Sequence, residues 1–308
     1  MQPETTILIW GPSHSGSTLL GFLLGSQQHC FALGEWINYC TEVLQYTSAW
    51  RKAPWPHLLW RKQQGQYVAQ CSLCGTQCHI WQHNPPPKYD LPLVGHYQAI
   101  RKYLSKFGIT ANILIDSSKN HFYLEHMTQY NTDRENFYHV LTHKSVYDFV
   151  LGELKRQQGY DGISSTLSAT MIDMAKLHAT AWGNTVMGNK AALEHLNTPY
   201  LRVPYETLAS APIVTIARIL TQLNYTVPNI DIEYWNHHHH QIGGNPNAHH
   251  NLHKVRRVCA GSLPYSPAQG IAGIQLDQST SQAPVIIKDI CKTVDTARTG
   301  MEYLGRDL

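Results

Sequence analysis

Residues 6–24 decide the fold of this chain, and they read Thr6-Ile-Leu-Ile-Trp-Gly-Pro-Ser-His-Ser-Gly-Ser-Thr-Leu-Leu-Gly-Phe-Leu-Leu24. The apolar run at 6–10 predicts a buried strand, and the apolar residues after Ser17 predict a helix. Between them, Gly11 begins a loop with the G-x-x-x-x-G spacing of a phosphate-binding loop. The backbone N–H groups of such a loop and the positive end of the following helix converge on one point, where an anion binds. Ser17 stands where nucleoside triphosphatases have their lysine, so the sequence predicts a phosphate site and argues against ATP hydrolysis.

Length and composition set broad limits on the class of protein. With 308 residues, of which 43% are hydrophobic and 15% charged, the chain is long enough for one large α/β domain, which we expect to span residues 1–308. A net charge of +3 is too small to indicate a surface for nucleic acid or membranes. We expect no secretion signal, because no basic segment precedes an apolar one in the first residues, and no apolar run approaches the roughly 20 residues of a membrane-spanning helix. We therefore expect a cytoplasmic protein that binds neither nucleic acid nor membrane.

Four apolar runs predict strands, and helical patterns lie between them. The predicted strands are 6–10, 112–116, 137–141 and 200–203. The predicted helices are 17–25, 42–50, 96–107, 145–158, 167–195, 213–223 and 285–303. This alternation indicates an α/β fold, a P-loop-like parallel sheet flanked by helices on both faces. Ligands of such sheets bind at the carboxyl ends of the strands, so the polar residues that follow each strand should meet there.

Two segments do not fit the alternation of strands and helices. Residues 36–110 are irregular and rich in Trp, Gln and Pro, and residues 236–284 form a predicted loop rich in His, Gly and Asn. We expect both to contribute to the pocket of an acceptor molecule, because their aromatic and histidine side chains suit a small molecule.

Six short motifs, taken in order, resemble those of sulfotransferases that use 3′-phosphoadenosine-5′-phosphosulfate (PAPS), especially the bacterial and tyrosylprotein types. The motifs are Gly11-Pro-Ser-His-Ser-Gly-Ser-Thr18, Leu33-Gly-Glu-Trp36, Cys71-Ser-Leu-Cys-Gly-Thr-Gln-Cys-His-Ile-Trp81, Asp116-Ser-Ser-Lys119, Val203-Pro-Tyr-Glu-Thr-Leu208 and His240-Gln-Ile-Gly-Gly-Asn-Pro246. The resemblance implies a sulfotransferase fold, PAPS as co-substrate and 3′-phosphoadenosine 5′-phosphate (PAP) as product.

The resemblance also implies roles for individual residues. Glu35 corresponds to the glutamate that removes the acceptor's proton in the tyrosylprotein enzymes, which makes it the expected general base. His14 takes the loop position usually held by Lys or Arg, and a phosphate beside it should raise its pKa and keep it protonated. Lys119 would place an ammonium beside the sulfuryl group. The expected cradle for the 5′-phosphate consists of Ser13, His14, Ser15, Gly16, Ser17 and Thr18.

The segment expected to bind the 3′-phosphate departs from the family pattern. It reads Thr142-His-Lys-Ser145, with no arginine after its strand. We expect Lys144 and Ser145 to bind this phosphate, with Arg256 and Arg257 as alternatives because late loops often fold over a nucleotide. Two further strand-end groups should be structural: Asp116 should orient its turn, and Tyr205 and Glu206 should hold the sheet end.

Three of the seven cysteines, Cys71, Cys74 and Cys78, lie within eight residues. This spacing allows a metal site or a set of reduced cysteines under a loop. The candidates for completing a metal site are Cys30, Cys40, His79 and His83. Because no second pair of ligands is evident nearby, we predict no metal here, and for the histidine run 237–240 we expect a solvated loop.

Together these features predict a PAPS-dependent sulfotransferase of secondary metabolism that moves a sulfuryl group to a hydroxyl or amine of a small-molecule acceptor. Two other interpretations stay open. A P-loop small-molecule kinase shares the strand–loop–helix start, but it would need a lysine after Gly16 and a carboxylate for Mg²⁺. A non-catalytic metal-binding scaffold would use the Cys and His clusters instead.

Overall fold

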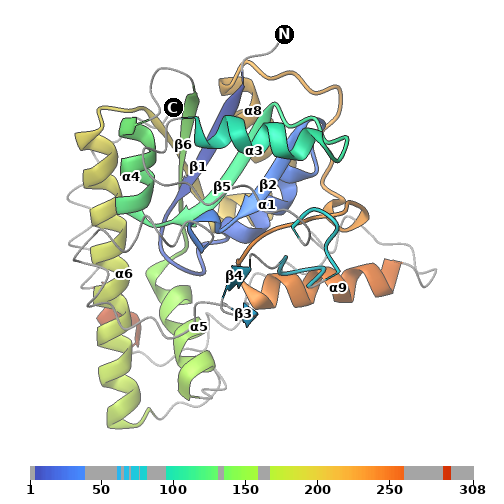
Figure 1. Ribbon diagram of the computed structural model, residues 1–308. Coiled ribbons are helices and arrows are strands. Elements are labelled where there is room, and N and C mark those ends of the chain that lie inside the picture. Colours follow the sequence, from blue (N-terminus) through green and yellow to red (C-terminus); the bar gives the residue numbers. More distant parts are fainter. Residues whose placement is uncertain are drawn as a thin grey trace.

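A five-stranded parallel sheet with the strand order β2-β5-β1-β6-β7 organises the protein (Figure 1). The computed structural model describes residues 4–38, 61–63, 66–68, 71–75, 77–81, 95–130, 135–158, 167–259 and 287–292. The strands of the sheet are β1 (Thr5–Trp10), β2 (Cys30–Gly34), β5 (Ile113–Lys119), β6 (Asn136–His143) and β7 (Tyr200–Pro204). A separate antiparallel hairpin pairs β3 (Arg61–Gln63) with β4 (Gln66–Val68). The predicted α/β fold with a parallel sheet is confirmed.

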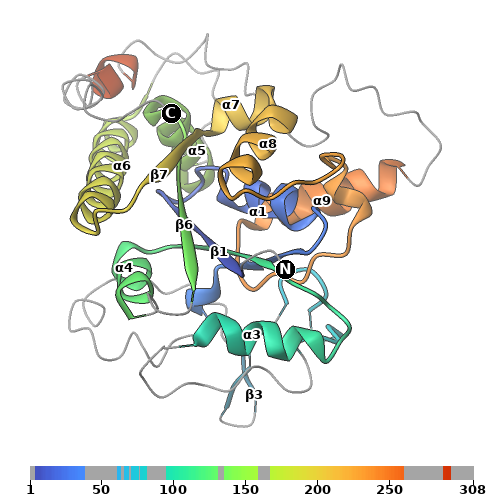
Figure 2. The same ribbon diagram turned by 90° about the horizontal axis from the view of Figure 1, so that it is seen from above.

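Helices cover both faces of the sheet, as Figure 2 shows. The helices are α1 (Ser17–Gly25), α3 (His96–Ser105), α4 (His121–Tyr130), α5 (Val146–Gln158), α6 (Ala169–His195), α7 (Tyr205–Ser210), α8 (Pro212–Gln222) and α9 (Pro246–Cys259), with short 3₁₀ helices η1 (Trp36–Asn38) and η3 (Tyr234–Asn236). Alternate residues of β1 explain the two layers, because successive side chains of a strand point to opposite faces. Ile7 and Ile9 pack with α1 and α8, whereas Leu8 and Trp10 pack with α3 and α4.

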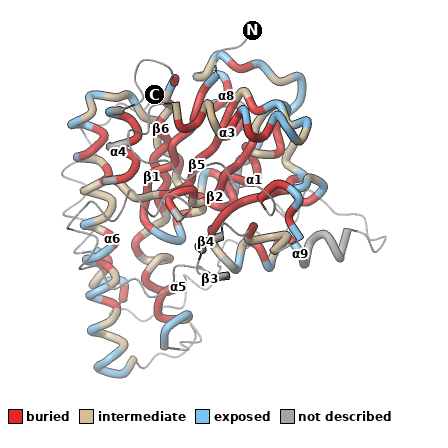
Figure 3. The backbone as a smooth tube through the Cα atoms, in the orientation of Figure 1, coloured by how far each residue is buried: buried red, intermediate tan, exposed pale blue. Residues whose placement is uncertain are grey.

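The central strands β1 and β5 lie between the two helical layers, and Figure 3 shows them buried along most of their length. A third apolar cluster joins α5 to α6 through Val150, Leu154 and Trp182. The lower parts of these two helices extend below the sheet in Figure 1. None of the described helices combines the length and apolarity needed to cross a bilayer.

The predicted strands and most predicted helices are confirmed. The helices predicted at 17–25, 96–107, 145–158, 167–195 and 213–223 correspond to α1, α3, α5, α6 and α8. The helix predicted at 42–50 lies outside the described residues. Of the helix predicted at 285–303, residues 287–292 are described and are helical.

Several elements were not predicted, among them β2, α4 and α9. Strand β2 is short, ends in glycine and pairs with β5 alone at the edge of the sheet, so it lacks a long apolar run. Helix α4 begins two residues after the end of β5, and no helix was predicted there. Helix α9 lies in the segment 236–284, for which a loop was predicted, and that prediction is wrong over 246–259. The sequence of α9 lacks the apolar stripe that marks a helix: in its described part the buried residues are His249 and Leu252, and most of the other residues are polar.

For the irregular segment 36–110, the expectation that it builds an acceptor pocket stays a prediction. Its described parts contribute to the core: Tyr97 and Ile100 of α3 and Trp81 after the cysteines are fully buried against the sheet. Residues 39–60 and 82–94 of this segment lie outside the described residues.

Candidate active site

The loop after β1 is built around two glycines that other residues could not replace. Gly11 has φ 141°, and a Cβ on it would stand 2.1 Å from the carbonyl oxygen of Thr142. Gly16 has φ 87°, and a Cβ there would stand 2.5 Å from the ring of Tyr205. The loop is therefore seated against the end of β6 and against the residue that follows β7.

The start of α1 presents backbone N–H groups that no described side chain caps. Gly16 occupies the N-cap position in the left-handed conformation, without a side-chain hydrogen bond, and the first turn carries no acidic residue. Ser17 and Thr18 are the first helical residues, and both are buried. Uncapped N–H groups at the positive end of a helix form a site for an anion.

The Ser15 and Thr18 hydroxyls of the loop differ in their hydrogen-bond partners. The Thr142 hydroxyl donates to the carbonyl oxygen of Trp10 at 3.0 Å, so the Ser15 hydroxyl, 2.8 Å away, donates to Thr142. Ser15 thus holds the loop to β6 with its side chain, and only its backbone faces the predicted cradle. Thr18 accepts a hydrogen bond from the amide of Asn245 at 3.0 Å and keeps its own proton for a ligand. Ser13 lies exposed at the rim of the loop.

Glu35 and Lys119 form an ion pair at the carboxyl ends of two neighbouring strands. Gly34 of β2 lies opposite Asp116 of β5, so Glu35, which follows Gly34, lies beside the last residues of β5. Lys119 also pairs in register with Trp10, where β1 turns into the phosphate loop. The Glu35 and Lys119 side chains are 25% and 12% exposed, which shields the pair while leaving it within reach of a ligand.

Asp116 organises the turn beneath this ion pair, as expected. Its fully buried carboxylate accepts hydrogen bonds from the Tyr97 hydroxyl at 2.8 Å, the Tyr123 hydroxyl at 3.2 Å, and the amide and hydroxyl of Ser118. Ser118 in turn accepts from the amide of Ile37 at 2.9 Å, which ties β5 to the segment after Glu35. Burial raises the pKa of Asp116 to about 6, and the hydrogen bonds oppose that rise.

Titration of Asp116 should be visible in stability. Because its folded-state pKa of about 6 lies above the ordinary value of 3.8, the group stabilises the fold below pH 4, and this contribution is lost as the pH rises through 6. We expect the unfolding free energy of the wild type relative to Asp116→Asn to fall by about 2 kcal/mol between pH 4 and pH 6. Urea unfolding of both proteins at several pH values measures this difference. A constant or rising difference would contradict the prediction.

His14 stands at the rim of the loop between the start of α9 and α5. Its Nδ1 accepts from the Asn245 side-chain amide at 3.1 Å, and its Nε2 lies 3.3 Å from the buried carboxylate of Glu153. Burial lowers the pKa of His14, Glu153 opposes the shift, and the Lys119 charge adds to it. The rise of the His14 pKa was expected for the protein with a phosphate bound beside this histidine, and it stays a prediction. Lys119 and Glu35 both act electrostatically on His14, so the structure brings the three expected catalytic residues together.

The residues expected at the 3′-phosphate have separate positions. Lys144 places its ammonium 5.2 Å from the centre of the Tyr205 ring, which packs on Gly16 of the loop. Ser145 instead caps α5: its hydroxyl accepts from the Asp148 amide at 3.1 Å and donates to the Asp148 carboxylate at 2.6 Å, and its own amide donates to Glu206 at 2.9 Å. Tyr205 and Glu206 therefore have the expected structural role. Arg256 and Arg257 belong to α9, and their side chains are outside the described part of the chain.

The chain resembles known proteins in its structure and not in its sequence. No family model matches the chain, and no curated protein matches it. Solved structures do match. Sulfotransferase STF9 from Mycobacterium avium matches with 13% identity and a TM-score of 0.43, over 98% of this chain and 78% of that one. The sulfotransferase domain of the Synechococcus PCC 7002 olefin synthase matches with 14% identity and a TM-score of 0.43, over 96% of this chain and 95% of that one.

A third match is the sulfotransferase domain from the curacin biosynthetic pathway, with 14% identity and a TM-score of 0.44, over 95% of this chain and 98% of that one. These similar structures are all sulfotransferases.

Three residues of the site were missed by the sequence reasoning. Glu153 on α5 is buried and holds His14 and Arg156 together, and a lone acidic residue in a helix gives no signal of this. Asn245 lies in the last of the six motifs and joins α1 to His14. His249 is buried, its Nε2 has no hydrogen-bond partner among the described residues, and burial lowers its pKa to about 4 while Glu35 opposes the shift. Its position in α9 was hidden because that helix was not predicted.

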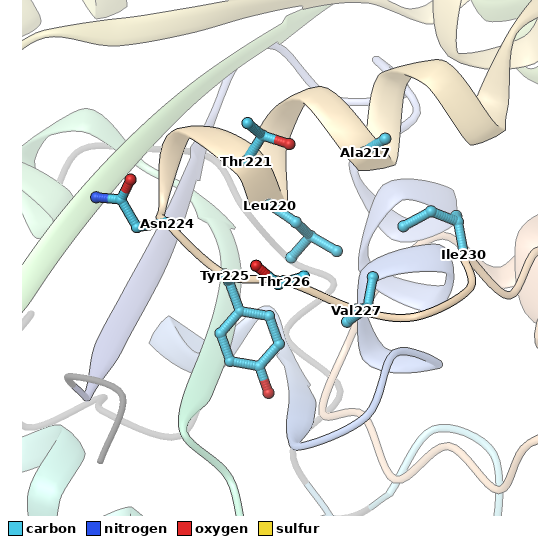
Figure 4. A pocket seen from close by; sticks show the side chains of 8 residues that line it. All are labelled: Ala217, Leu220, Thr221, Asn224, Tyr225, Thr226, Val227 and Ile230. Atoms are coloured by element: carbon cyan, nitrogen blue, oxygen red, sulfur yellow. The ribbon is translucent and has the colours of Figure 1, made fainter.

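A pocket elsewhere in the protein is drawn in Figure 4. It has a volume of about 360 Å³ and is lined by Ala217, Leu220, Thr221, Asn224, Tyr225, Thr226, Val227 and Ile230. The Tyr225 hydroxyl donates to the carbonyl oxygen of Gln28 at 2.9 Å, just before β2 begins, so the pocket lies at the amino ends of the strands. No charged side chain lines it, and it is not part of the candidate site.

Proposed function

We propose that the protein transfers a sulfuryl group from PAPS to a hydroxyl or amine of a small-molecule acceptor. The observation that carries this proposal is the Glu35–Lys119 ion pair, which stands next to an uncapped phosphate loop. A carboxylate there suits proton removal from an acceptor, and the cation suits the negative charge of a sulfated nucleotide. The six sequence motifs give the same function.

The residues at the loop fit the donor substrate. The free N–H groups at the start of α1 suit the 5′-phosphate, and Thr18 has a hydroxyl proton to donate. Cationic side chains surround the loop: Lys119 at the end of β5, Lys144 over Tyr205, and Arg156 close enough to act on His14. We propose Lys144 as the contact of the 3′-phosphate, because Ser145 is engaged as a helix cap.

The reaction needs one proton to leave the acceptor as its oxygen or nitrogen bonds to sulfur and the bond from sulfur to the phosphate oxygen breaks. Glu35 would take that proton, and PAP would leave with the bonding electron pair. Lys119 and the loop amides would stabilise charge on the sulfuryl and bridging oxygens, and His14 would do so beside the leaving phosphate when protonated. The transferred group carries less charge than a phosphoryl group, so the reaction makes no demand for Mg²⁺.

The kinase interpretation is less well supported. Its lysine would have to follow Gly16, where Ser17 is buried at the first position of α1. A scaffold protein would have no need of a shielded carboxylate–ammonium pair beside an anion site. Zinc bound by the purified protein without any affinity for nucleotides would favour the scaffold.

Calorimetric titration separates these functions. We expect PAP to bind without Mg²⁺ at least about tenfold more tightly than ATP, a difference of about 1.4 kcal/mol. AMP, which lacks the 3′-phosphate, should bind more weakly than PAP, and Lys144→Ala should abolish this preference. Lys176→Ala on the exposed face of α6 is the matched control. Tighter binding of ATP that depends on Mg²⁺ would overturn the proposal.

A further inference from the structure

The three clustered cysteines meet a histidine that lies more than 150 residues further along the chain. The ligand atoms of Cys71, Cys74, Cys78 and His240 all lie within 4.8 Å of one another. The His240 Nδ1 is 3.4 Å from the Cys74 sulfur and 3.3 Å from the Cys78 sulfur. A tetrahedral zinc ion with Zn–S of about 2.3 Å and Zn–N of about 2.0 Å places sulfur and nitrogen about 3.5 Å apart. The two sulfur–nitrogen separations of 3.3 and 3.4 Å therefore match a zinc coordination shell, and the other ligand atoms lie within 4.8 Å, so that small side-chain shifts would complete it.

The backbone around the cluster has the form of a metal-binding turn. The amide of Cys74 points to the Cys71 sulfur at 3.4 Å, and the amide of Gly75 donates to the Cys71 carbonyl oxygen at 2.9 Å. Gly75 has φ 61°, which lets the chain turn sharply and bring two cysteines to the same side. An N–H group that points at a sulfur stabilises the thiolate form, which is the form that binds a metal.

The cluster is enclosed on the protein side. Cys71 and Cys78 are 1% exposed, and His240 is 8% exposed. The Trp81 side chain donates to the His240 carbonyl oxygen at 2.7 Å and holds the histidine segment against the cysteine turn. None of the three cysteines is in a disulfide.

We propose that Cys71, Cys74, Cys78 and His240 bind one zinc ion in a closed, structural site. Three thiolates and one imidazole match the Cys₃His set of structural zinc centres, and four protein ligands leave no position for water or substrate. Binding would release three thiol protons for each Zn²⁺ taken up, with no change of oxidation state. The proposal departs from the sequence-based prediction of no metal, because the structure brings His240, rather than Cys30, Cys40, His79 or His83, to the three cysteines.

The site would act as a clamp between distant segments. Ile242, two residues after His240, forms bridges with both Cys71 of the cysteine turn and Gly34 at the end of β2. The Ser72 amide donates to the Gln241 carbonyl oxygen at 2.8 Å, and the Glu35 amide donates to the Ile242 carbonyl oxygen at 2.6 Å. A metal at the cluster would hold the cysteine turn, the segment around His240 and the backbone of Glu35 in one unit.

Metal analysis of the full-length protein tests the site. Protein purified under reducing conditions and supplied with zinc should contain about one zinc per chain after dialysis. Cys74→Ser and His240→Ala should weaken zinc binding by about 10²-fold or more, measured by competition with a chromogenic chelator. His240→Cys, which keeps four ligands, should retain the metal. Cys30→Ser removes a free cysteine outside the cluster and is the matched control.

A second readout does not depend on the variants. Removal of zinc from the wild type with a chelator should lower Tm by about 5 °C or more, and added zinc should restore it. A wild-type protein with reduced thiols that holds less than about 0.1 zinc per chain would overturn the proposal. Unchanged zinc affinity in both Cys74→Ser and His240→Ala would also overturn it. The calorimetric titration with PAP involves other residues, so this proposal and the sulfotransferase proposal can fail separately.

Discussion

Glu35→Gln should lower turnover by about 10²-fold or more and leave the affinity for PAP no weaker than in the wild type. Glutamine keeps the size of the side chain and can still accept a hydrogen bond from Lys119, but it cannot take a proton from the acceptor. The loop amides proposed to hold the nucleotide do not depend on the carboxylate. Single-turnover kinetics with PAPS and calorimetry with PAP measure the two effects separately.

The control for this substitution is Glu125→Gln. Glu125 also forms an ion pair, with His195 at 3.1 Å, but this pair joins α4 to α6 away from the loop. Its removal should change turnover by less than about twofold, because exposed ion pairs contribute little. If Glu35→Gln behaves like Glu125→Gln, Glu35 is not the base, and the nearby His249 becomes the residue to test.

Gly11→Ala should destabilise the fold by about 3 kcal/mol or more. A Cβ at this position would stand 2.1 Å from the Thr142 carbonyl oxygen, a backbone atom that cannot move without disturbing the end of β6. The φ of 141° adds strain for any residue with a side chain. The free energy of unfolding in urea measures the loss.

Gly108→Ala separates backbone strain from the steric clash. Gly108 also has positive φ, 73°, but a Cβ there would have nothing within 4 Å. We expect this variant to lose about 1 kcal/mol, the ordinary cost of the left-handed conformation. Equal losses in the two variants would show that the contact between the loop and β6 does not matter.

The phosphate loop illustrates what can be predicted locally. A strand, a glycine-bounded loop and a helix are neighbours in sequence, so the spacing of Gly11 and Gly16 and the apolar runs on both sides were enough to place the anion cradle. The same holds for Asp116, which sits at the end of an apolar run and was expected to orient the turn. Short edge strands and polar helices have no such signal, and for this reason β2 and α9 were missed.

The ion pair shows what depends on the order of strands. Both Glu35 and Lys119 were named from their motifs, but their contact follows from β2 pairing with β5, and β2 was not predicted. Ser145 is a second example. Its hydroxyl was expected to bind a phosphate, but it donates a hydrogen bond to Asp148 at the start of α5. Roles of this kind follow from three-dimensional neighbours, which spacing along the chain does not reveal.

By itself, the amino-acid sequence determined the parallel α/β plan and the strand, glycine loop and helix with which it begins, because both rest on patterns within a few residues of one another. The tertiary structure alone decided that Glu35 meets Lys119, that Glu153 and Asn245 hold His14, and that His240 joins the three cysteines. Those contacts join segments far apart in sequence, and only the packing of strands and helices brings such segments within bonding distance.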